Sequence, residues 1–240
     1  MQHPVKVSVL VRSFNNEATV SAALSSALDQ NFPRQDYEVI AVDDGSTDGT
    51  PERLRSFASE VSVNLEKHRG NIETAHSALS RARGKYFAFL DADDAYEPDF
   101  LSEMSGALDA QPGAAFAYCD YYEIDANGTR AITIDRKIIK LVACNCMFDR
   151  EIVAREGFWE RDLLLPELSL AVELSQRYGV AFVPKPLYRY FRHGASLTHQ
   201  SGLVDKAFAQ LAEKYRVLLR GRDLDELSID DCRAAVKQTG

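Results

Sequence analysis

Three carboxylates lie within four residues, at Asp91, Asp93 and Asp94, directly after the apolar run 86–90. Like charges this close repel one another, so the cluster is costly unless a cation or hydrogen-bond donors compensate it. Carboxylate oxygens suit Mg²⁺ and Mn²⁺, and Mg²⁺ is commonly held by few protein carboxylates together with substrate phosphates. The acidic run therefore predicts a divalent-metal site. The plainer alternative is an acidic turn that caps the next helix.

A second acidic pair, Asp43 and Asp44, ends another apolar run at 37–42. One of these carboxylates could accept a hydrogen bond from a nucleobase or a ribose. Phe14 follows the first apolar run and could stack on the face of a base, although a core aromatic is the alternative. Together these residues predict a nucleotide site.

Glycine is absent from the first 44 residues. Dinucleotide-binding folds and P-loops need glycines after the first strand, because the backbone there must approach the phosphates closely. Both are disfavoured, as is a sugar-nucleotide pyrophosphorylase with its glycine-rich loop. Without such a glycine-rich loop, the negative charge of a bound diphosphate must be compensated by a metal ion and by side chains.

The elements that would position these residues alternate along the chain. Apolar patterning predicts strands at 5–11, 37–42, 61–65 and 86–90, and helices at 20–28, 50–57 and 72–82. Such alternation indicates an α/β fold with a mainly parallel sheet covered by helices. Ligands of these sheets bind beyond the carboxyl ends of the strands, which here are followed by the loops 12–16, 43–48 and 91–94.

From about residue 113 the pattern changes. Strands are predicted at 116–122, 142–148 and 180–183, a hairpin turn at 127–128, and helices at 167–177 and 203–219. We therefore expect one domain with a first half at 1–112, a second half at 113–200 and a C-terminal helical extension at 201–240. That extension is a candidate surface for a homodimer.

Composition limits the partners. The 240 residues include 28 basic and 36 acidic side chains, a formal net charge of -8, which argues against nucleic acid as a partner. The four cysteines form no CxxC pair, the start of the chain does not read as a signal peptide, and no apolar run approaches the ~20 residues of a spanning helix. We expect a cytoplasmic protein with at most peripheral membrane association.

Three segments carry a family resemblance: VSVLVRSFNNEATVSAALSSALDQNFP, YEVIAVDDGSTDGT and ARGKYFAFLDADD. In order and spacing they resemble the nucleotide-binding half of family 2 glycosyltransferases, and the stretch 166–198 resembles the acceptor half. The resemblance implies a GT-A type single domain, a Rossmann-like sheet with a mixed acceptor-side half, and C-terminal helices. It also implies metal-assisted, inverting sugar transfer from a nucleotide-sugar, most often a UDP-sugar, to a saccharide or lipid-linked saccharide hydroxyl.

The resemblance also assigns roles in donor binding. Phe14 and Asp44 would hold the nucleobase, with Asp43 beside them in the nucleotide-binding loop. Asp91 would reach the ribose or the metal. Two further ligands are implied for Mg²⁺ or Mn²⁺.

These further ligands are Asp93, which would bind the metal that bridges the diphosphate, and His193, whose alternative is a surface histidine. The family's Ala-Arg-Asn run reads Ala75-His76-Ser77 here. A phosphate-facing arginine is therefore absent, or replaced by His76 or Arg69.

The catalytic base implied by the resemblance is Glu167. The family carries Glu-Asp ahead of the acceptor-side helix, and counting back from residues 177–179 places that pair on Pro166 and Glu167. The carboxylate is retained on a side chain one methylene longer. A simple helix cap is the alternative role for Glu167, and Glu160 and Asp162 are the alternative bases. A catalytically silent nucleotide-sugar-binding protein and a nucleotidyltransferase are the alternative functions.

Overall fold

The protein is described by a computed structural model that covers residues 5–134, 137, 140–192, 202–219, 223 and 226–236. Its strands are, in chain order, β1 (Val7–Ser13), β2 (Tyr37–Asp43), β3 (Ser62–Leu65), β4 (Tyr86–Asp91), β5 (Ala95–Tyr96), β6 (Ala114–Asp125), β7 (Gly128–Ile132), β8 (Cys146–Asp149) and β9 (Gly179–Phe191). Within the described residues they form one nine-stranded sheet with the order β3-β2-β1-β4-β8-β6-β9-β5, and β7 pairs with β6.

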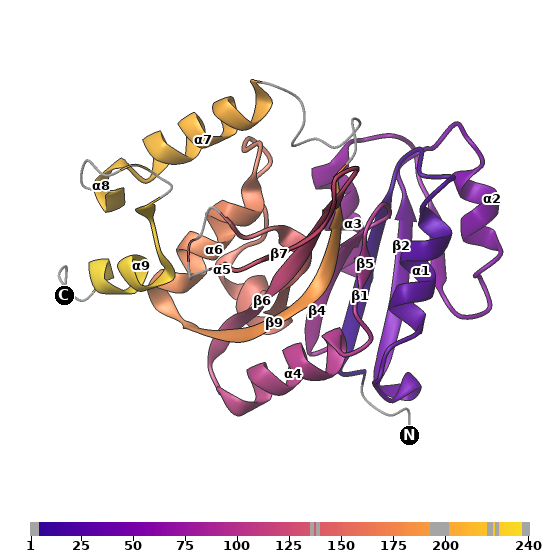
Figure 1. Ribbon diagram of the computed structural model, residues 1–240, viewed down its shortest axis with the longest axis horizontal. Helices are drawn as coiled ribbons and strands as arrows, with labels where there is room; N and C mark the ends of the chain where they lie inside the picture. Colours follow the sequence, from indigo (N-terminus) through magenta and orange to yellow (C-terminus); the bar gives the residue numbers. More distant parts are fainter. Residues whose placement is uncertain are drawn as a thin grey trace.

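Helices flank this sheet (Figure 1). They are α1 (Val20–Leu28), α2 (Thr50–Arg55), α3 (Asn71–Arg81), α4 (Phe100–Ala110), α5 (Arg150–Glu156), α6 (Pro166–Arg177), α7 (Leu203–Lys214), α8 (Arg216–Leu219) and α9 (Ile229–Val236), with the short 3₁₀ helices η1 (Arg34–Asp36) and η3 (Ala143–Asn145). α3 packs on β1 and β2, and α4 packs on β6 and β9. The predicted α/β class is confirmed.

The first half of the sheet is parallel. β1 pairs with both β2 and β4, and β2 pairs with β3. All seven residues of β1 are buried, as expected for a central strand covered on both faces. The register places Arg12 beside Asp91 and Ser13 beside Asp43. The polar ends of three strands therefore meet at one edge of the sheet.

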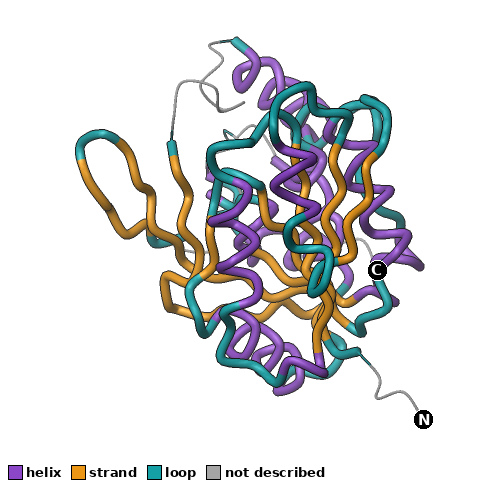
Figure 2. The backbone as a smooth tube through the Cα atoms, turned by 90° about the vertical axis from the view of Figure 1, so that its right-hand side faces the viewer, coloured by secondary structure: helices purple, strands orange, loops and turns teal. Residues whose placement is uncertain are grey.

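The second half of the sheet is mixed. β8 runs antiparallel to β4 and β6, whereas β9 runs parallel to β6. β6 and β7 form a hairpin that extends beyond the rest of the sheet (Figure 2). The hairpin turn consists of residues 126 and 127, between the paired Asp125 and Gly128, one position before the predicted 127–128.

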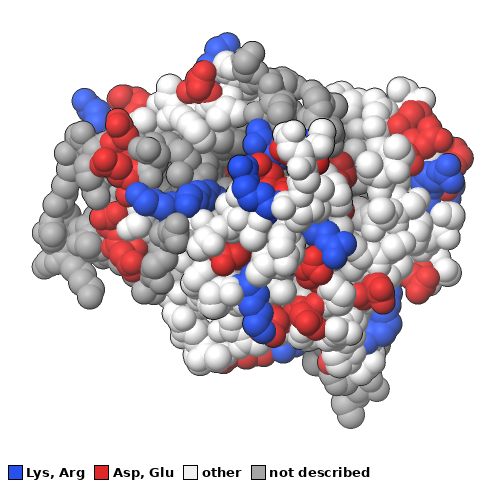
Figure 3. All heavy atoms as spheres, in the orientation of Figure 1, with Lys and Arg blue, Asp and Glu red and all other residues white. Residues whose placement is uncertain are grey.

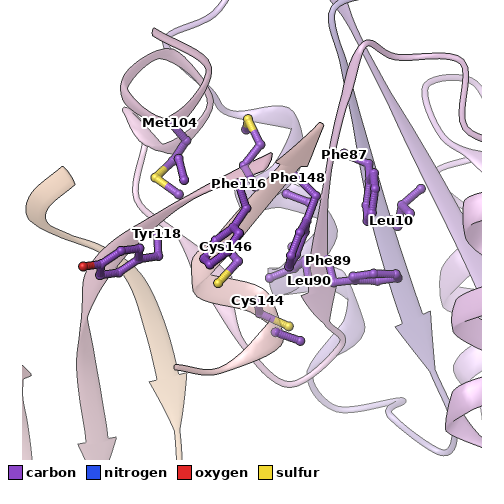
Figure 4. Packing of buried hydrophobic residues seen from close by; sticks show 14 of the residues in the cluster. Leu10, Phe87, Phe89, Leu90, Met104, Phe116, Tyr118, Cys144, Cys146 and Phe148 are labelled. Atoms are coloured by element: carbon purple, nitrogen blue, oxygen red, sulfur yellow. The ribbon is translucent and has the colours of Figure 1, made fainter. Parts of the chain in front are cut away.

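Aromatic side chains fill the junction between the two halves (Figure 4). Phe87 on β4 stacks on Phe148 of β8 with ring centroids 5.3 Å apart, and Phe116 on β6 lies 5.6 Å from the same ring. All three side chains are buried. Burying each one stabilises the fold by about 1.5–3 kcal/mol. This shared core holds the strands of the second half, β6 and β8, against β4.

Two predicted strands differ from the structure. β9 continues through Pro184 and Pro186 instead of ending before them. Its pairing with β6 is irregular there, with register shifts on both sides of Asp120, so the prolines sit where the regular ladder is interrupted. The predicted strand 142–148 begins only at Cys146. Before it, the Asn145 side chain accepts a hydrogen bond from the Val142 backbone N–H at 3.1 Å, which favours a tight turn over an extended chain.

The helical elements also differ in part. The predicted tail helix 203–219 is interrupted at Tyr215, between α7 and α8. The Tyr215 hydroxyl contacts the Ser169 side chain and backbone of α6, which ties the interruption to the neighbouring helix. α5 and α9 were not predicted. Among the described residues, no helix combines the length and the apolar character needed to cross a bilayer.

Asp149 caps α5, and its loss gives the first prediction. One carboxylate oxygen accepts the backbone N–H groups of Glu151 and Ile152, both at 3.0 Å. Asp149→Ala should lower the free energy of unfolding by about 1 kcal/mol, because these two donors lose their partner. Asp149→Ser should restore most of the loss. Urea unfolding followed by circular dichroism measures both changes.

Asp99 provides the matched control, because it precedes α4 without making a side-chain cap hydrogen bond. Asp99→Ala should therefore destabilise the protein less than Asp149→Ala. Equal stability of the two variants would contradict the capping role of Asp149.

Candidate active site

A cavity of about 480 Å³ lies at the edge where the parallel strands end. Among the residues that line it are five that the sequence predicted as functional: Phe14, Asp44, Asp91, Asp93 and Glu167. They come from the ends of β1, β2 and β4 and from the first turn of α6. Residues separated by more than 150 positions thus share one site. The predicted ligand His193 lies outside the described residues.

Asp43 is buried and orders the loop that follows β2. Its carboxylate accepts hydrogen bonds from the Ser46 backbone N–H at 3.0 Å and from the hydroxyls of Ser46 and Ser13 at 2.5 and 3.3 Å. It does not line the cavity, unlike Asp44. The hydrogen bonds of Asp43 therefore hold this loop in shape.

Asp44 is also buried, and its carboxylate anchors the segment 68–70. It accepts the backbone N–H groups of Arg69 at 2.7 Å and Gly70 at 2.9 Å, and His68 Nδ1 lies 2.9 Å away. Gly45 allows this approach: its φ is +75°, and a Cβ there would lie 2.6 Å from the His68 backbone nitrogen. The glycine of the DDGS loop is therefore needed for close packing against this segment.

Phe14 faces the cavity with 44% of its side chain exposed. One face of its ring stacks on His68, with centroids 4.5 Å apart and planes at 28°. His68 was not identified from the sequence. It follows β3, whose carboxyl end lies at the same edge of the parallel sheet, where ligands of such sheets bind.

The three carboxylates after β4 have different surroundings. Asp94 is buried, contacts the Tyr188 hydroxyl and accepts the Phe191 backbone N–H at 2.7 Å. Burial, and then the neighbouring Asp91 and Asp93, raise the pKa of Asp94 to about 8. Asp94 is therefore mostly protonated at neutral pH, which lowers the repulsion within the cluster.

Asp91 is held by an arginine that the sequence analysis did not single out. Arg12 Nη2 lies 2.5 Å from Asp91 Oδ1, and Arg12 Nη1 donates to Asn71 Oδ1 at 3.0 Å. The Asp91 side chain is still 40% exposed. It can therefore present its second carboxylate oxygen to a ligand in the cavity.

Glu167 begins α6 directly after Pro166, which occupies the first helical turn. Desolvation raises the pKa of Glu167 to about 7; its own backbone N–H and Arg12 act to lower the pKa, and Asp91 acts to raise it. A simple dipole cap would be ionised and solvated. A carboxyl group with a pKa near 7 inside a cavity is instead suited to proton transfer at neutral pH.

The alternative bases lie elsewhere. Glu160 contacts Lys214 and accepts the Ser169 hydroxyl at 3.2 Å. Neither Glu160 nor Asp162 lines the cavity. His76 is held outside the cavity lining as well, with Nε2 at 3.0 Å from the Trp159 carbonyl oxygen. Trp159 itself does line the cavity and was not predicted.

The carboxylates fit a divalent cation only in part. Asp91 and Asp93 supply hard oxygen donors to the same cavity, as Mg²⁺ or Mn²⁺ requires. In the described part of the chain, no group of three or more His, Cys, Asp or Glu side chains is placed to hold a metal by itself. This donor set fits a cation whose remaining ligands come from a diphosphate and water.

Comparison with known proteins agrees with this architecture. The family model "Glycosyl transferase family 2" matches residues 8–156. A putative teichuronic acid biosynthesis glycosyltransferase of Bacillus subtilis is 35% identical over 127 residues, which are 51% of this chain and 49% of that protein. An Escherichia coli UDP-Glc:alpha-D-GlcNAc-diphosphoundecaprenol beta-1,3-glucosyltransferase is 33% identical over 124 residues, 50% of this chain and 47% of its own length.

Solved structures share the fold. Staphylococcus aureus TarS in complex with UDP-GlcNAc superposes with a TM-score of 0.74 at 16% identity, covering 97% of this chain and 72% of that one. A Pyrobaculum calidifontis mannosyltransferase in complex with GDP-Man and Mn²⁺ superposes with a TM-score of 0.66 at 18% identity. The match covers 99% of this chain and 69% of that one.

The chain spans about half the length of these two curated relatives. The family match covers more than half of this chain and includes the ends of β1, β2 and β4, which supply most of the cavity's carboxylates. With its GT-A fold, the chain belongs to glycosyltransferase family 2.

Proposed function

We propose that the protein transfers a sugar from a nucleoside-diphosphate donor to an acceptor hydroxyl with inversion at the anomeric carbon. The observation that carries this proposal is that Glu167, with a pKa of about 7, shares one cavity with the carboxylates after β4. A group that accepts a proton thus faces the groups that would hold the donor. This is the arrangement needed for attack by an otherwise weak nucleophile.

The transfer proceeds as a single displacement. Glu167 accepts the acceptor's hydroxyl proton while its oxygen forms a bond to the anomeric carbon. The bond from that carbon to the diphosphate oxygen breaks on the opposite face, so the nucleoside diphosphate leaves and the configuration inverts. Bound Mg²⁺ or Mn²⁺, held by Asp93 with Asp91 as a further candidate ligand, would supply positive charge for the departing diphosphate.

The nucleobase would lie at Phe14. His68 stacks on one face of its ring, so the nucleobase would stack on the other face, and the neighbouring Asp44 supplies a carboxylate to the same cavity. A uridine diphosphate sugar is the preferred donor, because the buried Asp44 carboxylate would select a nucleobase that has an N–H donor in its ring plane. The names of two similar proteins include UDP-Glc or UDP-GlcNAc.

The acceptor would be a saccharide or a lipid-linked saccharide used in polysaccharide biosynthesis. The relatives named above include a glucosyltransferase whose acceptor carries a diphosphoundecaprenol and a teichuronic acid glycosyltransferase. The acceptor would enter beside α6, because Glu167 lies there.

Glu167→Gln tests the base. The amide keeps the shape of the side chain but cannot accept the proton, so turnover should fall by about 10²–10⁴-fold while UDP affinity and melting temperature change little. In the wild type, turnover should rise with pH through about 7, because only the deprotonated carboxylate accepts a proton. UDP release from UDP-glucose and UDP-GlcNAc, with a short-chain GlcNAc-diphospholipid as acceptor, measures both.

Glu173→Gln is the matched control on the same helix, because Glu173 lies outside the cavity lining and contacts Lys214. It should retain turnover. Near-wild-type turnover by Glu167→Gln would refute the assignment of Glu167 as the base. A wild type that binds UDP-sugar but never releases UDP would favour a binding protein.

Asp93→Asn tests the metal. Removing one anionic oxygen should weaken UDP binding in Mn²⁺ by about tenfold or more, equivalent to ~1.4 kcal/mol. Isothermal titration calorimetry with and without a chelator measures this loss, and exposed Asp99→Asn serves as control. If the wild type binds UDP equally well in chelator, the metal has no role in holding the diphosphate.

Phe14→Ala tests the surface proposed to bind the nucleobase. It should weaken binding of every nucleoside diphosphate by about 1–3 kcal/mol, whereas Phe14→Tyr should retain affinity because its ring can still stack. In competition assays CDP should bind less tightly than UDP, because cytosine lacks the ring N–H that a carboxylate accepts. Equal competition by CDP would remove the selecting role given to Asp44.

A further inference from the structure

Arg12 is a buried cation in an otherwise apolar strand. It is the penultimate residue of β1 and is 6% exposed, at the edge of the candidate active site. Its guanidinium carbon lies 4.9 Å from the ring centroid of Phe89 and 5.0 Å from that of Trp159. These two rings also stack on each other, and the guanidinium is hydrogen-bonded to Asp91 and Asn71. A side chain so constrained has little freedom to move with a ligand.

The position of this cation follows from the sheet register. Arg12 on β1 and Asp91 on β4 are direct neighbours across a parallel pair, where adjacent strands are about 4.8 Å apart. The ion pair between them uses one oxygen of Asp91. It therefore fixes the direction in which the exposed remainder of the carboxylate faces the cavity.

Arg12 and Glu167 line the same cavity, so the guanidinium charge acts on the Glu167 carboxyl group. Burial acts to lower the pKa of Arg12, but Asp91, Cys144 and Glu167 raise it well above its ordinary value, so the group stays cationic. Burial and Asp91 both raise the pKa of Glu167, and Arg12 is the neighbouring cation that opposes them. Cys146 is a further titratable group near Glu167.

We propose that Arg12 is a positioning residue for the transfer: it orients Asp91 toward the donor and supplies the positive charge that keeps Glu167 able to accept a proton. The inference rests on the proposed function. Arg12 lines the cavity, but its guanidinium is buried, Nη1 and Nη2 bind Asn71 and Asp91, and Nε is buried without a partner, so we infer that Arg12 acts through these neighbours. Lysine carries the same charge but lacks the planar guanidinium with its paired N–H donors. Arg12→Lys therefore separates the orientation of Asp91 from the effect of the charge on Glu167.

The experiment compares Arg12→Gln and Arg12→Lys with the wild type. Loss of the charge in Arg12→Gln should move the rise in turnover to higher pH and lower turnover at pH 7 by about tenfold or more, since a shift of one pKa unit changes the ionised fraction up to tenfold. Arg12→Lys should keep the wild-type pH profile but bind UDP in Mn²⁺ more weakly. Arg150→Lys, which alters an arginine bonded to the Gly84 carbonyl oxygen away from the cavity, is the control.

A double-mutant cycle tests whether Arg12 acts through Asp91. The loss of UDP affinity caused by Arg12→Lys should be large in the wild type and nearly absent in Asp91→Asn. Additive losses would overturn the positioning role. An unchanged pH profile in folded Arg12→Gln would overturn the effect on Glu167. If Arg12→Gln does not fold, the double-mutant cycle with Arg12→Lys still tests whether Arg12 acts through Asp91.

These results are distinguishable from failure of the proposed function. A wild type that neither binds UDP or GDP nor releases UDP from its sugars would refute that function, and this inference with it. Wild-type binding and turnover with unchanged Arg12 variants would refute this inference alone.

Discussion

The convergence of carboxylates at one edge of the sheet is the constraint on which the site depends. Parallel pairing brings the ends of β1, β2 and β4 together, and each acidic group there needs its own compensation. Asp43 uses serine hydroxyls, Asp44 uses two backbone N–H groups, and Asp91 uses Arg12. Asp94 and Glu167 instead have raised pKa values. Different solutions to one electrostatic problem thus give chemically similar side chains different properties.

Burial separates the roles further. Asp94 lies inside the protein and ties the acidic loop to β9 through Tyr188 and Phe191, so its nearly neutral carboxyl group serves the architecture. Asp94 and Glu167 both line the cavity, but Asp94 is 3% exposed and both of its oxygens have protein partners, whereas Glu167 is only partly buried. A raised pKa alone therefore does not identify a base, because exposure and existing hydrogen-bond partners distinguish the two groups.

Much of the site in the first half of the chain could be predicted from the sequence, because strand ends in a parallel sheet are easily read from apolar runs and polar loops. Phe14, Asp44 and Asp91 were found this way, and the structure places them in one cavity. Arg12 and His68 were missed for physical reasons. Arg12 directly follows the apolar run 5–11, and its importance appears only through its cross-strand neighbour Asp91. His68 depends on a loop that packs against Gly45, a contact between segments that no local pattern contains.

The second half of the chain is harder to predict, because tertiary contacts override the local sequence pattern there. The prolines in β9 are tolerated by an interrupted ladder with β6, and Asn145 bends the approach to β8 through side-chain hydrogen bonds, one of them to the Cys119 carbonyl oxygen at 2.5 Å. The family match ends at residue 156, before the cavity wall that contains Trp159 and Glu167. That wall is held by the aromatic junction with β4 and by the contacts of α6. The donor half provides a fixed edge, and packing against it brings the opposite wall close enough to complete the site.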